Sequence, residues 1–293
     1  MIDAGLDGRT AIVTGVNNAR GIGAAVAAAL AAQGVAVFAT YLRASGDSGA
    51  LREAANGTAG EALYRHLSTL SASEVVERVR HAGGRVDAVE VDLDDAAAPR
   101  QLFDRAEELF GPVSILVNNA AVSLADSLLP DEISGGAPSA GGIPIGAFDP
   151  ERHDRHFHVN VRAPALLMRE LARRLIERNT AWGRIISVST DGASGFATEV
   201  SYGASKHALE SVTRAAAAEL GRYGITANIV ALGPIQTGYI PPEAEPRIVA
   251  GTPLRRLGEP DDVADVVTFL ASHQARWLTG QLLYVGGGHA MSD

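Results

Sequence analysis

The sequence predicts an α/β protein with a doubly wound parallel sheet and helices on both faces. Short runs rich in β-branched residues alternate with longer, alanine-rich segments that have the apolar period of a helix. Apolar strands of this kind are typical of parallel strands buried on both faces. Neither a repeat of fixed period nor a linker divides the 293 residues, so we expect a single domain over residues 1–293.

The alternation gives the order of the elements. Strands are expected at residues 10–14, 35–40, 86–91, 113–117, 184–189, 225–230 and 282–285. Helices are expected at residues 22–33, 73–82, 99–110, 150–178, 202–223 and 261–272. Two connections are unusually long: residues 44–71, which predict a surface excursion or a partly mobile flap, and residues 122–149, which have the composition of a loop.

The composition excludes several classes of function. With 25 Lys+Arg against 34 Asp+Glu, the net charge is -9, and no basic surface favours nucleic acid or an anionic membrane. The apolar runs are too short to cross a bilayer, and the first residues lack the pattern of a signal peptide. The absence of cysteine excludes disulfides and thiolate chemistry and agrees with a cytoplasmic location. We therefore expect small molecules or further copies of the chain as partners.

The turn after the first strand favours phosphate binding. It reads Thr14-Gly15-Val16-Asn17-Asn18-Ala19-Arg20-Gly21-Ile22-Gly23 and leads into a helix. Glycines at such a junction let the backbone approach a pyrophosphate, which binds the free N–H groups of the helix N-terminus. The pattern is not the G-x-G-x-x-G fingerprint, and a turn that only eases packing is the alternative.

The end of the second strand bears on the choice of dinucleotide. It reads Tyr41-Leu42-Arg43, with no acidic residue to bind a ribose 2′-hydroxyl. Arg43 and Arg20 suit a 2′-phosphate, which favours NADP(H) and leaves NAD(H) as the second choice. Two solvated surface arginines are the alternative interpretation.

Polar residues also follow the third and fourth strands. Asp92-Leu93 and Asn118-Asn119-Ala120 stand at carboxyl strand ends, where doubly wound sheets bind ligands. A simple turn would also explain the paired asparagines.

Tyr202 and Lys206 are the strongest candidates for chemistry. They lie four residues apart in an expected helix and therefore share one face. An ammonium beside a phenol favours the phenolate, so we expect a lowered pKa of Tyr202 and an acid/base that works near neutral pH. An ordinary amphipathic helix is the alternative.

The expected helix at 150–178 contains unusual polar residues. Asn160 is locally unfavourable in mid-helix, which indicates a function. His153, His156 and His158 have no carboxylate or cysteine to complete a metal site, so we expect a solvated helix start and no metal.

Together these motifs resemble the short-chain dehydrogenase/reductase family across nearly all of residues 7–288. Gly258-Glu259-Pro260-Asp261-Asp262-Val263-Ala264 and Leu278-Thr279-Gly280-Gln281 are similar to its 3-oxoacyl-carrier-protein reductase branch. The resemblance implies a Rossmann-like, NAD(P)-binding fold, reduction of a ketone or oxidation of a secondary alcohol, and a homotetramer paired through the two long helices.

The resemblance also implies a role for each matching residue. Tyr202 gives a proton to the carbonyl oxygen as hydride arrives from the nicotinamide, Lys206 holds the ribose hydroxyls, and Asn160 keeps a water relay in place. The other cofactor contacts are Asp92 and Leu93 near adenine, Asn118 and Ala120 along the cofactor, and Gly233, Ile235 and Thr237 near the carboxamide.

The chain departs from the family pattern in its turns. Gly15 and Gly21 enclose five residues where three are usual, which implies a longer phosphate loop. Leu232-Gly233 stands where the family has Pro-Gly, which implies a shifted nicotinamide wall.

The catalytic hydroxyl has two candidates. Ser189 lies the usual thirteen residues before Tyr202, whereas the strand pattern aligns Thr190 with the family position. We favour Thr190, because a slip inside a strand turns every side chain to the opposite face while a shorter loop costs little. Ser189 remains the second candidate.

Two other functions compete with carbonyl reduction. Enoyl reductases of the same superfamily have longer first turns, but their Tyr and Lys are farther apart than here. A non-catalytic nucleotide-binding relative is disfavoured by the intact set of Tyr202, Lys206 and Asn160.

Overall fold

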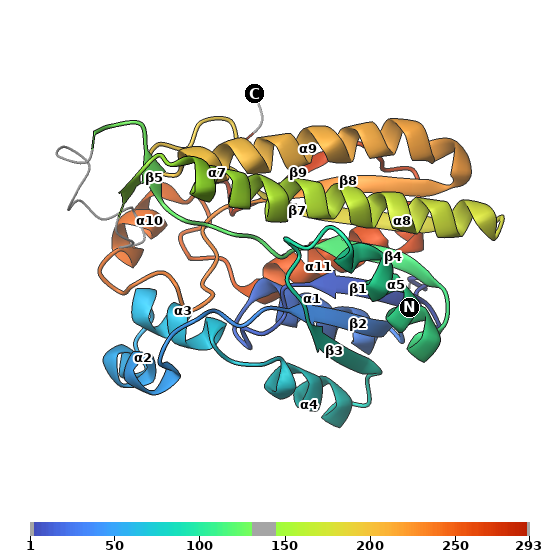
Figure 1. Cartoon of the computed structure of the whole chain (residues 1–293), viewed down its shortest axis with the longest axis horizontal. Coiled ribbons are helices and arrows are strands. Elements are labelled where there is room, and N and C mark those ends of the chain that lie inside the picture. The colour runs from blue at the N-terminus through green and yellow to red at the C-terminus, as the bar shows by residue number, and fades with distance from the viewer. Residues whose placement is uncertain (1–2, 131–144, 292–293) are drawn as a thin grey trace.

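The computed structural model describes residues 3–130 and 145–291. Its centre is a seven-stranded parallel sheet of order β3-β2-β1-β4-β7-β8-β9, with helices on both faces (Figure 1). The order runs outward in one direction from β1 and in the other from β4. A doubly wound sheet binds its ligands at the carboxyl ends of the strands beside such a switch point.

The strands confirm the predicted alternation. They are β1 Thr10–Thr14, β2 Ala36–Tyr41, β3 Val86–Glu90, β4 Val113–Asn118, β7 Gly183–Thr190, β8 Ile225–Leu232 and β9 Leu282–Val285. β1, β4 and β8 are buried along their whole length, which explains their continuous apolar sequences.

Two hydrophobic cores lie on opposite faces of this sheet. The first joins the sheet to α1 Ile22–Ala32, α4 Ser73–His81 and α11 Pro260–Ala271. The second joins it to α5 Ala98–Phe110, α8 Ala163–Glu177 and α9 Val200–Leu220. Each helix directs its apolar stripe at the sheet, as the doubly wound architecture requires.

The connection at residues 44–71 is a surface excursion, the first of the two expected alternatives, and it is folded. This segment forms a helical hairpin of α2 Ser48–Ala55 and α3 Glu61–Ser68. Asp47 caps α2 by accepting hydrogen bonds from the backbone of Gly49 and Ala50. Leu63 and Leu67 of α3 pack on Ala55, so the hairpin has a small core of its own.

The helix expected at 150–178 is present but is interrupted by a π-helical turn. The chain forms α7 Pro150–Phe157, a π-helix η1 over His158–Arg162, and then α8. A π-turn holds one residue more than an α-helical turn, and such turns are frequent at functional sites.

Several short elements were not predicted. They are β5 Asp126–Ser127 and β6 Gly146–Ala147, which pair in parallel, α10 Glu245–Gly251, and the 3₁₀ turns η2 Gly221–Tyr223 and η3 His273–Ala275. Residues 131–144 of the expected 122–149 loop lie outside the described residues.

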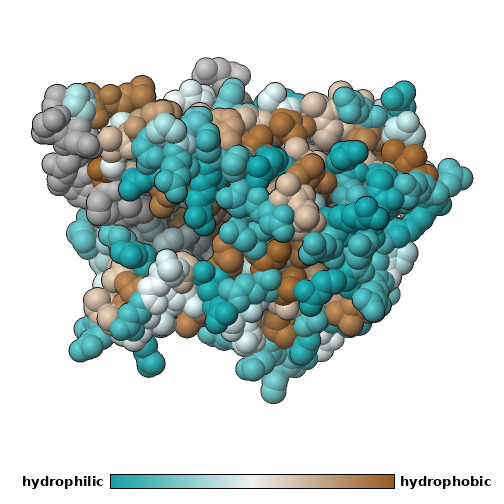
Figure 2. Space-filling model, viewed as in Figure 1, coloured by the Kyte–Doolittle hydropathy of each residue, from teal (hydrophilic) through white to brown (hydrophobic). Residues whose placement is uncertain are grey.

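The surface agrees with the composition. Hydrophilic residues cover most of the face seen in Figure 2. Across the described ranges 3–130 and 145–291, no helix has both the length and the apolar character needed to cross a bilayer.

Candidate active site

The glycine-rich turn after β1 is fixed by close backbone contacts. Gly15 has φ +77°, and a Cβ atom there would lie 2.8 Å from Cα of Ala120. A Cβ atom at Gly23 would lie 2.2 Å from the carbonyl oxygen of Gly15. Only glycine fits at these two positions. Gly21 begins α1 without a side-chain cap and without an acidic residue in the first turn, which leaves a helix N-terminus suited to an anion.

A second asparagine, Asn119, holds this turn against the end of β4. Its Nδ2 donates to the carbonyl oxygens of Thr14 and Gly15 over 2.8 and 2.9 Å. The hydroxyl of Thr14 in turn accepts from the backbone N–H groups of Asn119 and Ala120, both over 3.0 Å. The sequence prediction included Asn118 and Ala120 but missed Asn119, although the paired asparagines were the available signal.

The extra residues of the turn anchor it to distant segments. Nδ2 of Asn17 donates to the carbonyl oxygens of Ser68 and Leu70 over 3.0 and 3.2 Å. Nδ2 of Asn18 donates to the carbonyl oxygen of Thr237 over 3.0 Å. The side-chain amides of both asparagines thus bind backbone carbonyl groups, and the longer turn links the N-terminus of α1 to the α2–α3 hairpin and to the loop after β8.

The two arginines proposed for a 2′-phosphate differ in their surroundings. Arg43 forms a bidentate pair with Glu90, with Nε at 2.9 and 3.0 Å from the two carboxylate oxygens. Arg20 instead lines a hollow of about 730 Å³ beside the α2–α3 hairpin, together with Arg52 and His66 and one acid, Glu53. Since the carboxylate of Glu90 already binds Arg43, Arg20 is the better placed of the two for an anion.

The other predicted cofactor residues lie near carboxyl strand ends but differ in burial. Leu93 and Ile235 are buried in the two cores, so only their backbones can meet a ligand. Asp92 accepts a hydrogen bond from the backbone of Asp94 over 2.9 Å. Asn118 is 3% exposed, and its Oδ1 has no hydrogen-bond partner in the part of the chain that the structure describes. Tyr41 is the last residue of β2, and Gly233 directly follows the last residue of β8.

Lys206 is buried on α9 one turn after Tyr202. It is 2% exposed, and its Nζ donates to the carbonyl oxygen of Val188 over 2.8 Å. Nζ lies 5.7 Å from the centroid of the Tyr202 ring, so the two side chains share a face as predicted. Burial lowers the pKa of Lys206 to about 8, and the carboxylate of Glu210 opposes this shift.

The expected lowering of the Tyr202 pKa was wrong. Burial raises the pKa of this phenol above its ordinary value. Further increases come, in decreasing order, from Glu199, Tyr64, Asp191 and Tyr239. The ammonium of Lys206 donates its hydrogen bond to the carbonyl oxygen of Val188. In this structure Tyr202 therefore holds its proton at neutral pH.

Asn160 connects the π-helix to both neighbouring parts of the site. It is 1% exposed, its Oδ1 accepts from the backbone N–H of Val122, and its Nδ2 donates to the carbonyl oxygen of Val122, both over 2.8 Å. The same Nδ2 donates to Oγ of Ser205 over 3.0 Å, and Ser205 donates to the carbonyl oxygen of Tyr202 over 2.7 Å. Asn160 thus joins the loop after β4 to the turn of α9 that holds Tyr202.

Ser189 and Thr190 end β7 and point to opposite faces of the sheet. Ser189 is 3% exposed, and its hydroxyl donates to Oε1 of Glu210 over 2.7 Å. Thr190 is partly exposed, and its hydroxyl accepts a long 3.4 Å hydrogen bond from the backbone of Gly192. The hydroxyl of Ser189 is therefore occupied by a buried hydrogen bond. The hydroxyl of Thr190 is the more available of the two for a substrate.

Of the three histidines expected at a solvated helix start, His156 does not fit that expectation, whereas His153 and His158 are partly exposed. His156 is completely buried, its Nε2 accepts from the backbone of Leu124 over 3.0 Å, and its Nδ1 donates to the carbonyl oxygen of Arg152 over 2.7 Å. Burial lowers its pKa, which keeps the ring neutral. Within residues 3–130 and 145–291, no group of three or more potential metal ligands is found.

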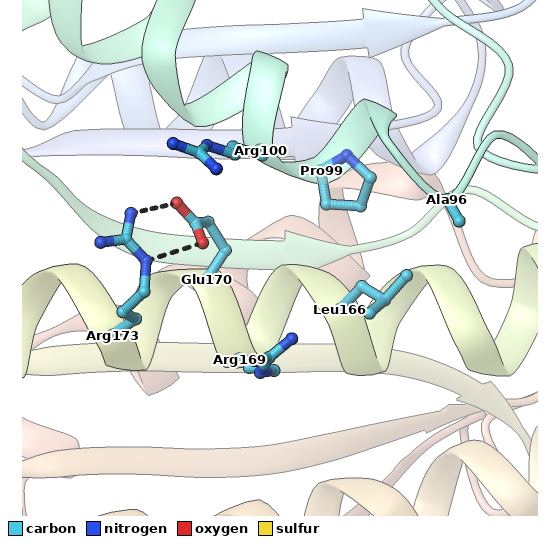
Figure 3. A pocket seen from close by; sticks show the side chains of 7 residues that line it. All are labelled: Ala96, Pro99, Arg100, Leu166, Arg169, Glu170 and Arg173. Atoms are coloured by element: carbon cyan, nitrogen blue, oxygen red, sulfur yellow. Dashed lines mark hydrogen bonds and ion pairs between the residues drawn. The ribbon is translucent and has the colours of Figure 1, made fainter.

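A smaller hollow of about 330 Å³ lies between α5 and α8, away from these residues. Arg100, Arg169 and Arg173 line it, and the carboxylate of Glu170 is turned toward Arg173 (Figure 3). Its lining includes no residue of the Tyr202 site.

The comparisons with known proteins agree with this geometry. The sequence model of a family described as enoyl-(acyl carrier protein) reductase matches residues 64–290. An Arabidopsis thaliana relative, named as a chloroplastic NADPH-dependent aldehyde reductase-like protein, is 33% identical and aligns over 97% of this chain and 95% of its own. A short-chain dehydrogenase/reductase of Serratia marcescens is similar in structure, with a TM-score of 0.75, 31% identity and coverage of 98% of this chain and 99% of that chain.

A blue fluorescent protein from a metagenomic library, solved in complex with NADPH, gives a TM-score of 0.73 at 33% identity, covering 98% of this chain and 99% of that chain. Sequence and structure are thus similar over almost the whole chain. Together with the glycine-rich turn after β1 and the shared face of Tyr202 and Lys206 on α9, these similarities lead to one conclusion: the chain belongs to the short-chain dehydrogenase/reductase family of oxidoreductases.

Proposed function

We propose that the protein is an NADP(H)-dependent carbonyl reductase that interconverts a ketone and a secondary alcohol. The observation that carries this proposal is the arrangement on α9, where the phenol of Tyr202 and the buried ammonium of Lys206 share one face. The bonds of Asn160 to Ser205 and Val122 hold the same turn in place. Such a set can move a proton to and from a substrate oxygen.

The residues around the first turn fit a dinucleotide. Only glycine fits at Gly15 and Gly23, which keeps the first turn tight, and α1 begins without a side-chain cap. Arg20, beside the hollow lined by Arg52, would hold a 2′-phosphate. The NADPH in the complex of the metagenomic protein and the name of the Arabidopsis relative support NADP(H) over NAD(H). When bound, the nicotinamide supplies the hydride.

The proton comes from Tyr202 in this proposal. As the hydride adds to the carbonyl carbon, the C=O π electrons move to oxygen, and that oxygen takes the phenol proton to become the alcohol hydroxyl. Because its pKa is raised, Tyr202 is protonated at neutral pH, which suits reduction. The hydroxyl of Thr190 binds the substrate oxygen. Lys206 and Asn160 hold in place the proton relay that returns a proton to the phenol of Tyr202.

Tyr202→Phe tests this proposal, because it removes only the oxygen that transfers the proton. Turnover of a panel of ketones, followed by NADPH absorbance, is expected to fall by ~10²–10⁴-fold. The dissociation constant for NADPH and the melting temperature are expected to stay as in the parent. Unchanged turnover in the variant would refute the assignment of Tyr202.

Enoyl reduction is the second candidate, because the matching family model is described as an enoyl reductase. The three residues between Tyr202 and Lys206 favour carbonyl reduction. A 3-oxoacyl thioester and the matching 2-enoyl thioester, offered separately with NADPH, distinguish the two: oxidation of NADPH by the enoyl thioester alone would favour enoyl reduction.

A further inference from the structure

The α2–α3 hairpin reaches the loop that follows β8. The backbone N–H of Gly60 donates to the carbonyl oxygen of Gly238 over 2.9 Å. A Cβ atom at Gly238 would lie 3.3 Å from Leu67 and 3.5 Å from Leu63, so the apolar side of α3 packs closely on this loop. Figure 1 shows α3 next to the chain that leads from β8 to α10.

Gln236 gives the loop after β8 a defined shape. Its Nε2 donates to the carbonyl oxygen of Ile240 over 2.9 Å. Its Oε1 accepts from the backbone N–H groups of Gly238 and Ile240 over 3.1 and 3.3 Å. Tyr239 lies between these anchored positions, so the loop holds its backbone in place.

The contact between hairpin and loop brings two tyrosines together. The rings of Tyr64 and Tyr239 have centroids 5.4 Å apart and planes at 71°, an edge-to-face pair. Tyr64 is 38% exposed, yet burial raises the pKa of its phenol. Tyr239 belongs to the loop that follows the carboxyl end of β8, the edge of the sheet where a doubly wound fold binds its ligands.

The same pair lies near the reacting phenol. Tyr64 and Tyr239 are both close enough to raise the pKa of Tyr202 electrostatically. Phe196, from the loop after β7, has its ring centroid 6.0 Å from that of Tyr202. An aromatic ring from each of three separate segments thus lies near Tyr202.

We propose that Tyr64 and Tyr239 form an aromatic wall of the substrate site and make the enzyme selective for ketones that carry an aromatic ring next to the carbonyl. The inference rests on the proposed carbonyl reduction and names its substrate class. A substrate ring can add a further edge-to-face or offset contact to this pair, whereas a saturated ring of the same size gains only from burial. In this proposal the α2–α3 hairpin contributes to substrate binding.

Acetophenone and cyclohexyl methyl ketone are the matched probes, because they differ in the aromaticity of one ring. The parent enzyme with NADPH is expected to have the higher kcat/KM for acetophenone. Tyr64→Leu is expected to lower kcat/KM for acetophenone by ~2–10-fold, the effect of one aromatic contact, and to leave that for the cyclohexyl ketone nearly unchanged. Tyr64→Phe is expected to keep the preference, because the ring remains.

Tyr223→Leu is the control variant, since Tyr223 is 37% exposed, like Tyr64, but lies at the far end of α9. It is expected to leave the ratio of the two kcat/KM values as in the parent. Equal effects of Tyr64→Leu on both ketones would overturn the inference and leave carbonyl reduction standing. Melting temperatures show whether the hairpin of each variant is folded.

Binding separates the inference from the proposed function. Calorimetric titration of acetophenone and of the cyclohexyl ketone into the NADPH complex of Tyr202→Phe measures ring selectivity without turnover. Tighter binding of acetophenone that is lost with Tyr64→Leu supports the wall even if the parent enzyme reduces neither ketone, a result that would overturn the proposed function alone. Equal binding of the two ketones contradicts the wall.

Discussion

Ser189 donates a 2.7 Å hydrogen bond to the carboxylate of Glu210, which lies on α9 one turn beyond Lys206 and is 4% exposed. A buried carboxylate requires such a donor, so this hydroxyl has a structural task. Thr190, the next residue of β7, makes only a long hydrogen bond with the backbone. The choice between the two candidates for the catalytic hydroxyl therefore becomes an experiment on two neighbouring residues.

Thr190→Val is expected to lower turnover by ~10²–10³-fold, the usual loss for one hydrogen bond to a developing oxyanion. Valine keeps the β-branched shape, so strand packing is preserved. Ser189→Ala is expected to turn over nearly as fast as the parent but to lose about 1–3 kcal/mol of stability, because Oε1 of the buried Glu210 loses the hydrogen bond from Ser189. Initial rates and melting curves of both variants provide the check, and the reverse ranking of rates would assign the role to Ser189.

Arg20→Ala is expected to weaken binding of NADPH by ~10–100-fold and to leave binding of NADH almost unchanged, because one charge-assisted contact to a 2′-phosphate is lost. Arg43→Ala is the matched control and is expected to have a small effect, since the Arg43 guanidinium binds Glu90. Fluorescence titration with both dinucleotides measures the four affinities. Equal weakening of NADPH and NADH by Arg20→Ala would show that Arg20 does not bind the 2′-phosphate.

Glu170→Gln is expected to remove part of the acid sensitivity of folding. Glu170 pairs with Arg173 and Arg174 over 2.6 and 2.7 Å, and hydrogen bonds from Arg173 and then Arg174 outweigh burial and lower its pKa from 4.5 to about 2. A carboxyl whose pKa is lower in the folded state stabilises the fold fully above about 4.5, and this stabilisation is lost as the pH falls toward 2.

Urea unfolding of parent and Glu170→Gln at pH 6, 4 and 3 tests this expectation. The parent should be the more stable at pH 6, and its advantage should shrink at each lower pH. A difference that stays constant across these values would mean that the pair with Arg173 and Arg174 does not shift the titration of Glu170.

Arg184→Met is expected to raise the melting temperature. Arg184 is 2% exposed, its guanidinium lies 4.3 Å from the ring centroid of Trp182, and that of Arg9 lies 3.8 Å from the same ring. Burial and the charge of Arg9 lower the pKa of Arg184 to about 10. Across residues 3–130 and 145–291 no carboxylate forms an ion pair with it, so methionine removes an unpaired buried charge and retains the apolar length.

Calorimetry of Arg184→Met provides the measurement, with Arg9→Met as the control. Arg9 is only partly buried, so its replacement should change the melting temperature less. A lower melting temperature for Arg184→Met would mean that the contact with Trp182 is worth more than the cost of burying the charge.

Light scattering is expected to find a tetramer of the 30.4 kDa chain, paired through α8 and α9, which lie side by side in Figure 1. Ala218 is exposed on α9 in a run of four alanines, so close approach of a second helix is sterically allowed there. Ala218→Arg is expected to reduce the mass by separating these helices. A monomeric parent would contradict the pairing.

The sequence predicted the sheet because its strands carry their own signal. β1 and β9 begin and end where they were predicted, and burial of β1 along its whole length explains its continuous apolar run. The site residues Tyr202, Lys206 and Asn160 were identified from their spacing and family pattern, and the structure brings them together.

The parts that were not predicted depend on contacts between distant residues. The hairpin of α2 and α3 is held by Leu67 against Gly238, and the π-turn by Asn160 against Val122, neither of which is visible in the local sequence. The pKa of Tyr202 is raised by burial, which spacing along a helix does not reveal.

The π-turn makes the length of the polypeptide between α7 and α8 as important as its residue types. His158–Arg162 carries one residue more than a regular helix would need for the same span. Deleting that residue would let a single unbroken helix form, but it would rotate α7 by about 100° relative to α8. Asn160 would then turn away from Val122 and Ser205, and His156 would leave its buried place beneath Leu124. A shorter, more regular helix could thus form, but its side chains would no longer meet their partners in the surrounding fold.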